Sequence, residues 1–166
     1  MRYLVKAIFL LIVFIIQSTL VQYIGIFGIV PNVLLAAIIA VSLSSETIEG
    51  ACLAALCGVV FDLMFGRVFG MSTLLYTYVA LLSRALLELM YEKTVVSTML
   101  ITFVGTLIYQ CVTFFFSFAI WGEGSFWFLF FRAMLPTAVY TGITQVAIYF
   151  INEKLPFIDG VRGART

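Results

Sequence analysis

Histidine is absent from the 166 residues of this sequence, and charged residues make up only 10% of it. The first absence removes the side chain that most often serves as a general base or a metal ligand near neutral pH. The second is far below the roughly 25% that is typical of a soluble globular domain. A net charge of +1 also provides no strongly basic surface, so no nucleic-acid partner is expected.

Residue arrangements that carry catalysis are missing too. There is no pair of carboxylates at a useful spacing, no nucleophile with a base, and no GK[ST] after the glycine-rich stretch Gly66–Gly70. The three cysteines, Cys52, Cys57 and Cys111, lie in apolar runs without a CxxC pair, which favours small buried apolar side chains over a disulfide or a metal site. The sequence therefore predicts a protein that is not an enzyme and has no cofactor or metal.

Hydrophobic residues, by contrast, make up 64% of the chain, and the mean hydropathy is +1.19. This composition indicates an integral membrane protein. Six apolar runs are each bounded by turn or polar residues: Ala7–Phe27, Pro31–Leu43, Glu49–Phe65, Met71–Met90, Val95–Ile120 and Phe126–Ile151. We expect an all-α, polytopic membrane bundle of six transmembrane helices over residues 1–151, followed by a short polar cytoplasmic tail, residues 152–166.

Basic residues are distributed unevenly around these spans. With six spans both termini share one side, and six basic residues flank the spans on that side: Arg2, Lys6, Lys93, Lys154, Arg162 and Arg165. Arg67 is alone in an opposite loop. Because cytoplasmic flanks carry an excess of Lys and Arg, both termini are predicted to be cytoplasmic.

Local signals place several helix ends. Pro31 suits the first position of the second helix, and Ser45 or Thr47 can cap the third. Gln17 and Gln22 are polar side chains in the first apolar run, so we expect both to need partners inside the bundle.

One stretch stands out because small residues and an acidic residue recur at every fourth position: Gly50, Ala54, Gly58, Asp62, Gly66 and Gly70. Residues four apart lie one above another on a helix, so Gly50, Ala54 and Gly58 form a small-residue face. Such a face lets a second helix approach closely within a membrane. We therefore predict that these three residues form a helix-packing face.

Asp62 follows that face and is a carboxylate in an apolar run. An unpaired Asp at the centre of a membrane helix costs about 2.5–3.5 kcal/mol by insertion scales. Three interpretations remain open: a structural ion pair with Arg132 or Arg67, an outward-facing partner site, or proton or substrate handling. Asp62, Arg67 and Arg132 are the candidate polar or partner site.

Two further features have a plain and a functional interpretation. Arg84 and Glu88 are one helical turn apart, which predicts a local pair, or alternatively a contact with a cytoplasmic partner. The aromatic segment Phe114–Phe131 contains Trp121 and Trp127, which are typical of a membrane interface. These two tryptophans are also candidate docking residues, because exposed aromatic side chains anchor partners.

The order of these signals resembles that of a known family. The residues concerned are Pro31-Asn32, Glu49-Gly50, Gly58 with Phe61-Asp62, Gly66, and Gly70 followed by Leu74 and Tyr76. In this order, and in its length and spans, the chain resembles the MreD family of bacterial rod shape-determining proteins over nearly its whole length.

That resemblance implies a non-enzymatic, multi-pass component of the bacterial inner membrane that belongs to the cell-elongation (rod) complex, a scaffold for rod shape and peptidoglycan synthesis. Its implied partners are an MreC-like protein, the actin-like MreB, the glycan polymerase RodA and its transpeptidase, besides membrane lipid. The family also resembles, in fold, the S components of energy-coupling-factor transporters. A substrate-binding subunit of a vitamin transporter is therefore the alternative, with Asp62, Arg67, Gln110, Glu123 and Arg132 as its few polar candidates.

Overall fold

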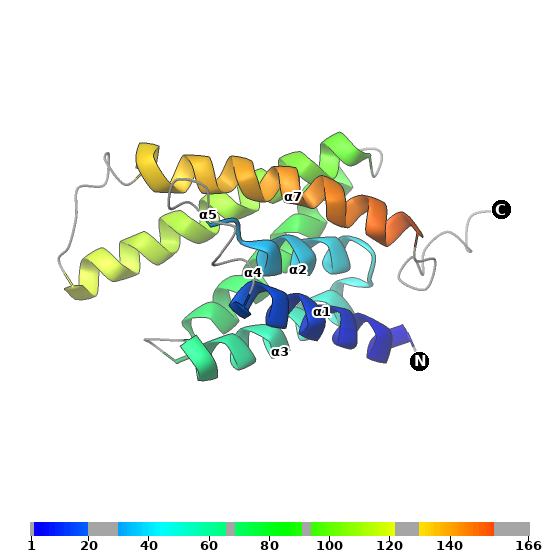
Figure 1. The fold of residues 1–166 in the computed structure, drawn as a ribbon, viewed down its shortest axis with the longest axis horizontal. Coiled ribbons are helices and arrows are strands. Elements are labelled where there is room, and N and C mark those ends of the chain that lie inside the picture. Colours follow the sequence, from blue (N-terminus) through cyan, green and yellow to red (C-terminus); the bar gives the residue numbers. More distant parts are fainter. Residues whose placement is uncertain (1, 20–29, 66–68, 91–93, 122–129, 155–166) are drawn as a thin grey trace.

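The structure, a computed structural model, describes residues 2–19, 30–65, 69–90, 94–121 and 130–154 (Figure 1). Within these ranges the chain is helical and contains no strand. The helices are α1 (Arg2–Thr19), α2 (Val33–Leu43), α3 (Thr47–Phe65), α4 (Met71–Leu89), α5 (Val95–Trp121) and α7 (Leu135–Lys154), the last preceded by a π-helical turn, η2 (Phe130–Met134). The expected all-helical class is thus confirmed for the described residues.

Helix α2 is the centre of the bundle. It contacts α1, α3, α4, α5 and α7, and in Figure 1 it lies between α1 and α7. Every residue from Leu34 to Leu43 is buried. Its sequence, VLLAAIIAVSL, is apolar on all sides, which is the pattern of a helix surrounded by other helices.

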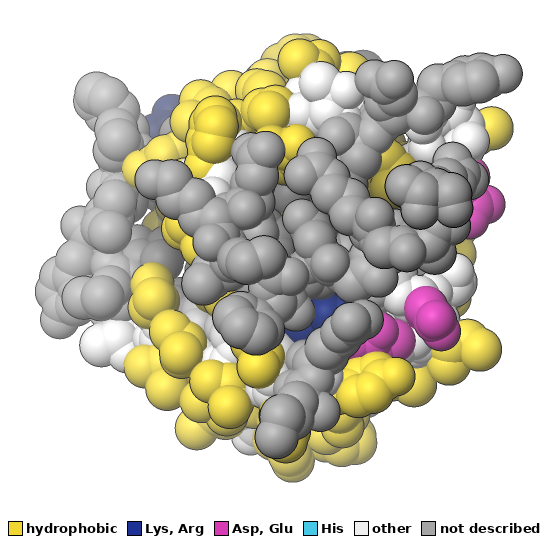
Figure 2. Space-filling view, turned by 90° about the vertical axis from the view of Figure 1, so that its right-hand side faces the viewer, with side chains coloured by type: hydrophobic (Ala, Val, Ile, Leu, Met, Phe, Trp, Pro, Cys, Tyr) yellow, Lys and Arg dark blue, Asp and Glu magenta, His cyan; other side chains and the backbone are white. Residues whose placement is uncertain are grey.

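The helices around α2 carry many exposed apolar side chains. Among the residues that the structure describes, three segments are long and apolar enough to cross a membrane: Thr47–Phe65, Val95–Phe116 and Phe130–Ile151. Their outward side chains are apolar and exposed, and Figure 2 shows large hydrophobic areas at the edges of the molecule. At about 1.5 Å per residue, the 11 residues of α2 extend roughly 16 Å, about half of a 30 Å hydrocarbon core.

The helix bounds correct two of the expected helix starts. The first residue of α2 is Val33 rather than Pro31, and Asn32 caps the helix, because its side chain accepts a hydrogen bond from Leu35 N. Ser45 does not cap α3, because its hydroxyl instead donates to Val41 O at 2.6 Å. Thr47 is the first residue of α3 rather than its cap.

The last helix also differs from the expectation. It continues to Lys154 and so includes three residues that were assigned to the polar tail. Its α-helical part begins at Leu135, directly before Pro136. Proline has no N–H to donate, so it is compatible with the first turn of a helix, where the π-helical turn changes to α.

Candidate functional site

The carboxylate of Asp62 binds the start of α4. Its Oδ2 accepts hydrogen bonds from Gly70 N at 3.0 Å, Thr73 N at 3.0 Å and Thr73 Oγ1 at 2.9 Å. Its Oδ1 accepts a fourth from Ser72 N at 3.1 Å. The first turn of a helix has free N–H groups and a partial positive charge, so it stabilises a carboxylate without a basic side chain.

Gly70 lets the chain reach this position. Its φ is +91°, in the left-handed region where residues with a Cβ are strained, and it is the N-cap residue directly before α4. The turn thus directs the N–H groups of Gly70, Ser72 and Thr73 towards α3. Asp62 is only 4% exposed, so these bonds replace the water that its charge would otherwise need.

The small-residue face of α3 lies directly beside this contact. Gly50, Ala54 and Gly58 are all buried. A Cβ added to Gly58 would lie 2.4 Å from Thr73 Cα and 2.8 Å from Thr73 N, which is closer than atoms can approach. At the other end of the face, a Cβ on Gly50 would lie 3.0 Å from Ser42 Cα on α2.

Gly58 and Asp62 therefore act on the same turn of α4. The glycine allows the backbone at Thr73 to approach α3, and the carboxylate one turn later accepts that residue's N–H and hydroxyl. This arrangement makes α3 and α4 a tightly joined pair, in agreement with their being the most extensively packed helices of the bundle.

Of the two candidate basic partners of Asp62, the structure describes only Arg132. Arg132 lies in η2 with an exposed side chain, and the expected Asp62–Arg132 ion pair is not among the ion pairs of the described residues. Arg67 and Trp127 lie outside the described residues, as do Gln22 and Glu123. Trp121 is the last residue of α5, and its side chain is likewise outside the description.

A second polar cluster, which the sequence analysis did not identify, surrounds the turn between α2 and α3. Lys6 of α1 is 2% exposed, and its Nζ donates to Ser45 Oγ at 2.9 Å and to Glu49 Oε1 at 2.8 Å. From the other side, Arg84 Nη1 donates to Ser45 O at 2.8 Å. Two basic side chains, from α1 and α4, thus converge on one turn.

Arg84 and Glu88 form only a loose pair. Arg84 Nε and Glu88 Oε1 are 3.8 Å apart, and the Glu88 side chain is 71% exposed. The stronger contact of Arg84 is therefore with the Ser45 carbonyl. Figure 2 shows acidic side chains beside a basic one at the end of the molecule that faces the viewer.

A third set of polar contacts holds the start of α2. Gln17 Oε1 accepts hydrogen bonds from Val33 N at 2.8 Å and Leu34 N at 3.3 Å, and Gln17 Nε2 donates to Pro31 O at 3.3 Å. Asn32 N donates to Thr141 Oγ1 of α7 at 3.0 Å. The N–H groups at the start of this buried helix are thus paired by α1 and α7.

Sequence reasoning also missed a threonine row on α5. Thr98, Thr102 and Thr106 are buried at every fourth position, and the hydroxyls of Thr102 and Thr106 donate to the carbonyl four residues earlier. The same spacing rule that identified the glycine face would have detected this row. One cysteine also departs from the expectation, because Cys52 is exposed.

Within the described residues, no group of three or more Cys, Asp or Glu side chains could hold a metal ion. The buried polar side chains instead bind other parts of the same chain. Asp62 binds the start of α4, Gln17 binds the start of α2, and Lys6 binds the turn between α2 and α3. Gln110, another polar candidate, donates to Met134 O at 3.2 Å. The geometry is that of a membrane bundle in which buried polar groups fix how helices pack.

The family described as rod shape-determining protein MreD matches residues 1–156. No curated protein and no solved structure matches the chain.

Proposed function

Because the chain belongs to the MreD family of rod shape-determining proteins, we propose that it is a non-enzymatic membrane component of the bacterial cell-elongation complex. The observation that carries this proposal is the extent of the family match, which includes every described residue. On this proposal the protein helps to maintain rod shape and to organise peptidoglycan synthesis. Its proposed partners are an MreC-like protein, MreB, RodA and the associated transpeptidase.

The proposed topology has six passages through the inner membrane, with both termini in the cytoplasm. It is supported by the basic residues that flank the spans on the side of the termini. In this arrangement α2 is a half-length helix inside the bundle, which its burial and its length of about 16 Å both favour.

The proposed role as a scaffold is supported by the contacts of the buried polar side chains, which bind other helices of the same chain. Asp62, Gln17 and Lys6 each bind another part of the same chain. A scaffold needs fixed relative positions of its helices. Hydrogen bonds between helices determine which turn of one helix contacts which turn of its neighbour. The membrane-facing surface then remains for partners and lipid.

A substrate-binding subunit of a vitamin transporter is the alternative. Such a protein needs several polar groups that converge on one pocket. Among the described candidates, Asp62 and Gln110 bind backbone groups of their own chain, which favours the scaffold.

Depletion of the protein in the bacterium that carries it distinguishes the two proposals. Loss of a scaffold rounds the cells and removes the MreC-like protein from a tagged pull-down of RodA. Loss of a transporter subunit stops uptake of a vitamin and leaves cell width unchanged. Restoration of rod shape by a plasmid copy is the control, and cells that stay rod-shaped on full depletion would contradict the scaffold.

A further inference from the structure

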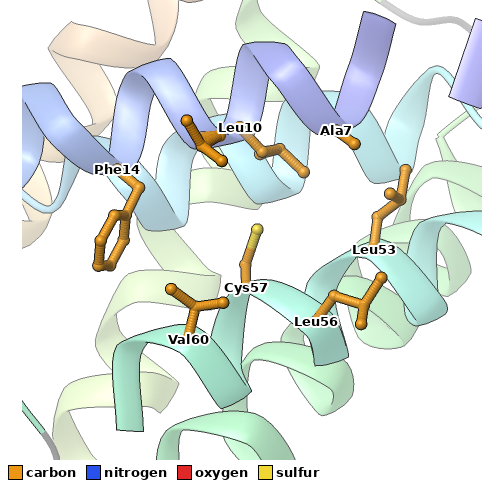
Figure 3. A pocket seen from close by; sticks show the side chains of 8 residues that line it. Ala7, Leu10, Phe14, Leu53, Leu56, Cys57 and Val60 are labelled. Carbon is orange, nitrogen blue, oxygen red and sulfur yellow. The ribbon is translucent and has the colours of Figure 1, made fainter. Parts of the chain in front are cut away.

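Helix α1 is held closely against α2 but only loosely against α3. Within the described residues it packs mainly on α2 and much less on α3. Between α1 and α3 lies an open hollow of about 170 Å³ with apolar walls. Figure 3 shows Leu10 of α1 and Cys57 of α3 on opposite sides of this gap. The middle of α1 is therefore not packed against α3, and how firmly α1 is held depends on its contacts near the two ends.

At the Thr19 end, the contacts of α1 are costly to lose. Gln17 Oε1 accepts hydrogen bonds from Val33 N at 2.8 Å and Leu34 N at 3.3 Å, at the start of the buried helix α2. If α1 left this position, both backbone N–H groups would lose their acceptor inside an apolar bundle. The Phe14 ring adds an edge contact with Phe61 of α3, with ring centroids 6.4 Å apart. This end of α1 is therefore the fixed end.

At the other end, each partner of Lys6 has a second group that stabilises it. Lys6 Nζ donates to Ser45 Oγ and to Glu49 Oε1. The Ser45 hydroxyl itself donates to Val41 O, so it stays hydrogen-bonded when Lys6 leaves. Glu49 lies in the first turn of α3, where free N–H groups favour a carboxylate. Its side chain is 15% exposed, so water can also reach it.

Lys6 can reach water only if α1 moves. Its side chain is 3% exposed, so the ammonium group is enclosed while the ion pair with Glu49 is made. Lys6 is the fifth residue of α1, about 6 Å from the start of that helix. A lysine so close to a helix end can extend its four-carbon stem and place the ammonium group in water. Breaking the Lys6–Glu49 pair and displacing the start of α1 are therefore one event.

The required movement is small because α1 is a long lever. Lys6 and Gln17 are eleven positions apart, or about 16 Å along the helix. A water molecule between Lys6 Nζ and Glu49 Oε1 needs a separation of roughly 5–6 Å, two hydrogen-bond lengths, instead of 2.8 Å. A swing of about 10° around Gln17 provides this displacement. Leu10 and Val13 are nearer to Gln17 and would move by only about 1–2 Å, so both keep their contact with α2.

We propose that α1 is a hinged helix, which pivots at Gln17 and is latched to α3 by the Lys6–Glu49 pair. The structure shows the latch closed. Opening it replaces the ion pair by water at the end of the bundle where α3 begins. The hollow between α1 and α3 then widens from that end, while α1 stays on α2. This hinge does not depend on a role in cell elongation.

Distances between spin labels test the hinge in the full-length protein in lipid nanodiscs, with the native cysteines replaced by alanine. One pair of labels, at Leu4 and Ile48, lies at the latched end, and another, at Ile15 and Leu63, lies at the pivot end. All four side chains are exposed. In double electron–electron resonance, Lys6→Met is expected to lengthen the mean Leu4–Ile48 distance by about 3 Å or more. The Ile15–Leu63 distance should change by less than about 1 Å.

Glu49→Gln is the second variant, and it covers the case in which Lys6→Met does not fold. It keeps the size and an acceptor oxygen of the side chain but removes the charge, so it should lengthen the distance at the latched end in the same way. Glu88→Gln is the matched control, because the Glu88 side chain is 71% exposed and pairs only loosely with Arg84, and both distances should stay unchanged. Equal lengthening at both ends would mean that α1 detaches as a whole. Unchanged distances in Lys6→Met or in Glu49→Gln would mean that α1 is fixed, and either result would overturn the hinge.

Discussion

Thr73 gives Asp62 two hydrogen bonds, one from its N–H at 3.0 Å and one from its hydroxyl at 2.9 Å, both to Oδ2. The acid is on α3 and the threonine is in the first turn of α4. Among the described residues, this charge in an apolar segment is thus stabilised by the start of a helix. Substitutions of Asp62 and Thr73 should therefore have coupled effects on the free energy of unfolding.

We expect Asp62 to be coupled to Thr73 and not to Arg132. Thr73→Val removes the hydroxyl but keeps the N–H, and Asp62→Ala removes the acceptor. In a double-mutant cycle on thermal unfolding of the purified protein, the Asp62–Thr73 pair should show a coupling of roughly 0.5–3 kcal/mol.

The corresponding cycle with Arg132→Gln is the control. Because no ion pair between Asp62 and Arg132 is found among the described residues, these two changes should add to within about 0.5 kcal/mol. A large coupling to Arg132, with none to Thr73, would mean that the carboxylate has its main partner elsewhere.

The close approach of Gly58 to α4 makes a second prediction. Gly58→Ala places a Cβ 2.4 Å from Thr73 Cα, a backbone atom that cannot move aside cheaply. We expect a destabilisation of about 1–3 kcal/mol from overpacking, seen as lower melting temperature and lower abundance in the membrane.

Gly142→Ala is the matched control, since the nearest atom to its added Cβ is Met99 Cγ at 3.7 Å. Alanine is preferred over glycine inside a helix by roughly 0.5–1 kcal/mol, so this variant should be unchanged or slightly more stable. Equal behaviour of the two variants would contradict a tight contact at Gly58.

These contacts also explain what could be predicted from the sequence. Apolar runs separated by turn residues located helices α3 and α4, which begin and end within two residues of the expected positions. The spacing of Gly50, Ala54 and Gly58 placed them on one side of a helix, because that depends only on helical geometry.

The partner of Asp62 could not be found in the same way. From the sequence, an acidic side chain is expected to pair with a basic one. Every residue except proline has a backbone N–H, so the sequence does not indicate which N–H groups bind Asp62. Lys6 binds Ser45 and Glu49, which are 39 and 43 positions away in the sequence. The distribution of charge predicted only that Lys6 flanks a span on the cytoplasmic side. Its burial depends on how α1 packs, which no local pattern specifies.

The buried pair Lys6–Glu49 makes a third prediction. Lys6→Met leaves the Glu49 carboxylate mostly buried without its cation, and removing one partner of a buried pair typically costs about 3–5 kcal/mol. The double variant Lys6→Met with Glu49→Gln should recover part of this loss in thermal unfolding. Glu88→Gln, at an exposed pair 3.8 Å apart, should change stability by less than about 0.5 kcal/mol.

A fourth prediction concerns the proposed topology. Reporter fusions after Lys93 and after Thr166 should be active in the cytoplasm, and a fusion within Gly122–Ser125 should be active in the periplasm. The basis is the excess of basic residues around the termini. A periplasmic reporter at the C-terminus would rule out six passages.

The last prediction concerns Gln17, which pairs buried backbone groups at the start of α2. Gln17→Leu keeps the size and apolar body of the side chain but leaves Val33 N and Leu34 N without their acceptor. Each unsatisfied buried group costs about 1–3 kcal/mol, and little water is present in the bundle to replace the bond. We therefore expect faster amide hydrogen exchange in α2, beginning at these two residues, together with a lower melting temperature.

Ser18→Ala is the neighbouring control for Gln17→Leu. The Ser18 hydroxyl donates only within its own helix, to Ile15 O at 3.0 Å, so its loss should be nearly neutral. If Gln17→Leu leaves exchange in α2 as slow as in the wild type, then the start of that helix is held by Asn32 and Thr141 without help from α1.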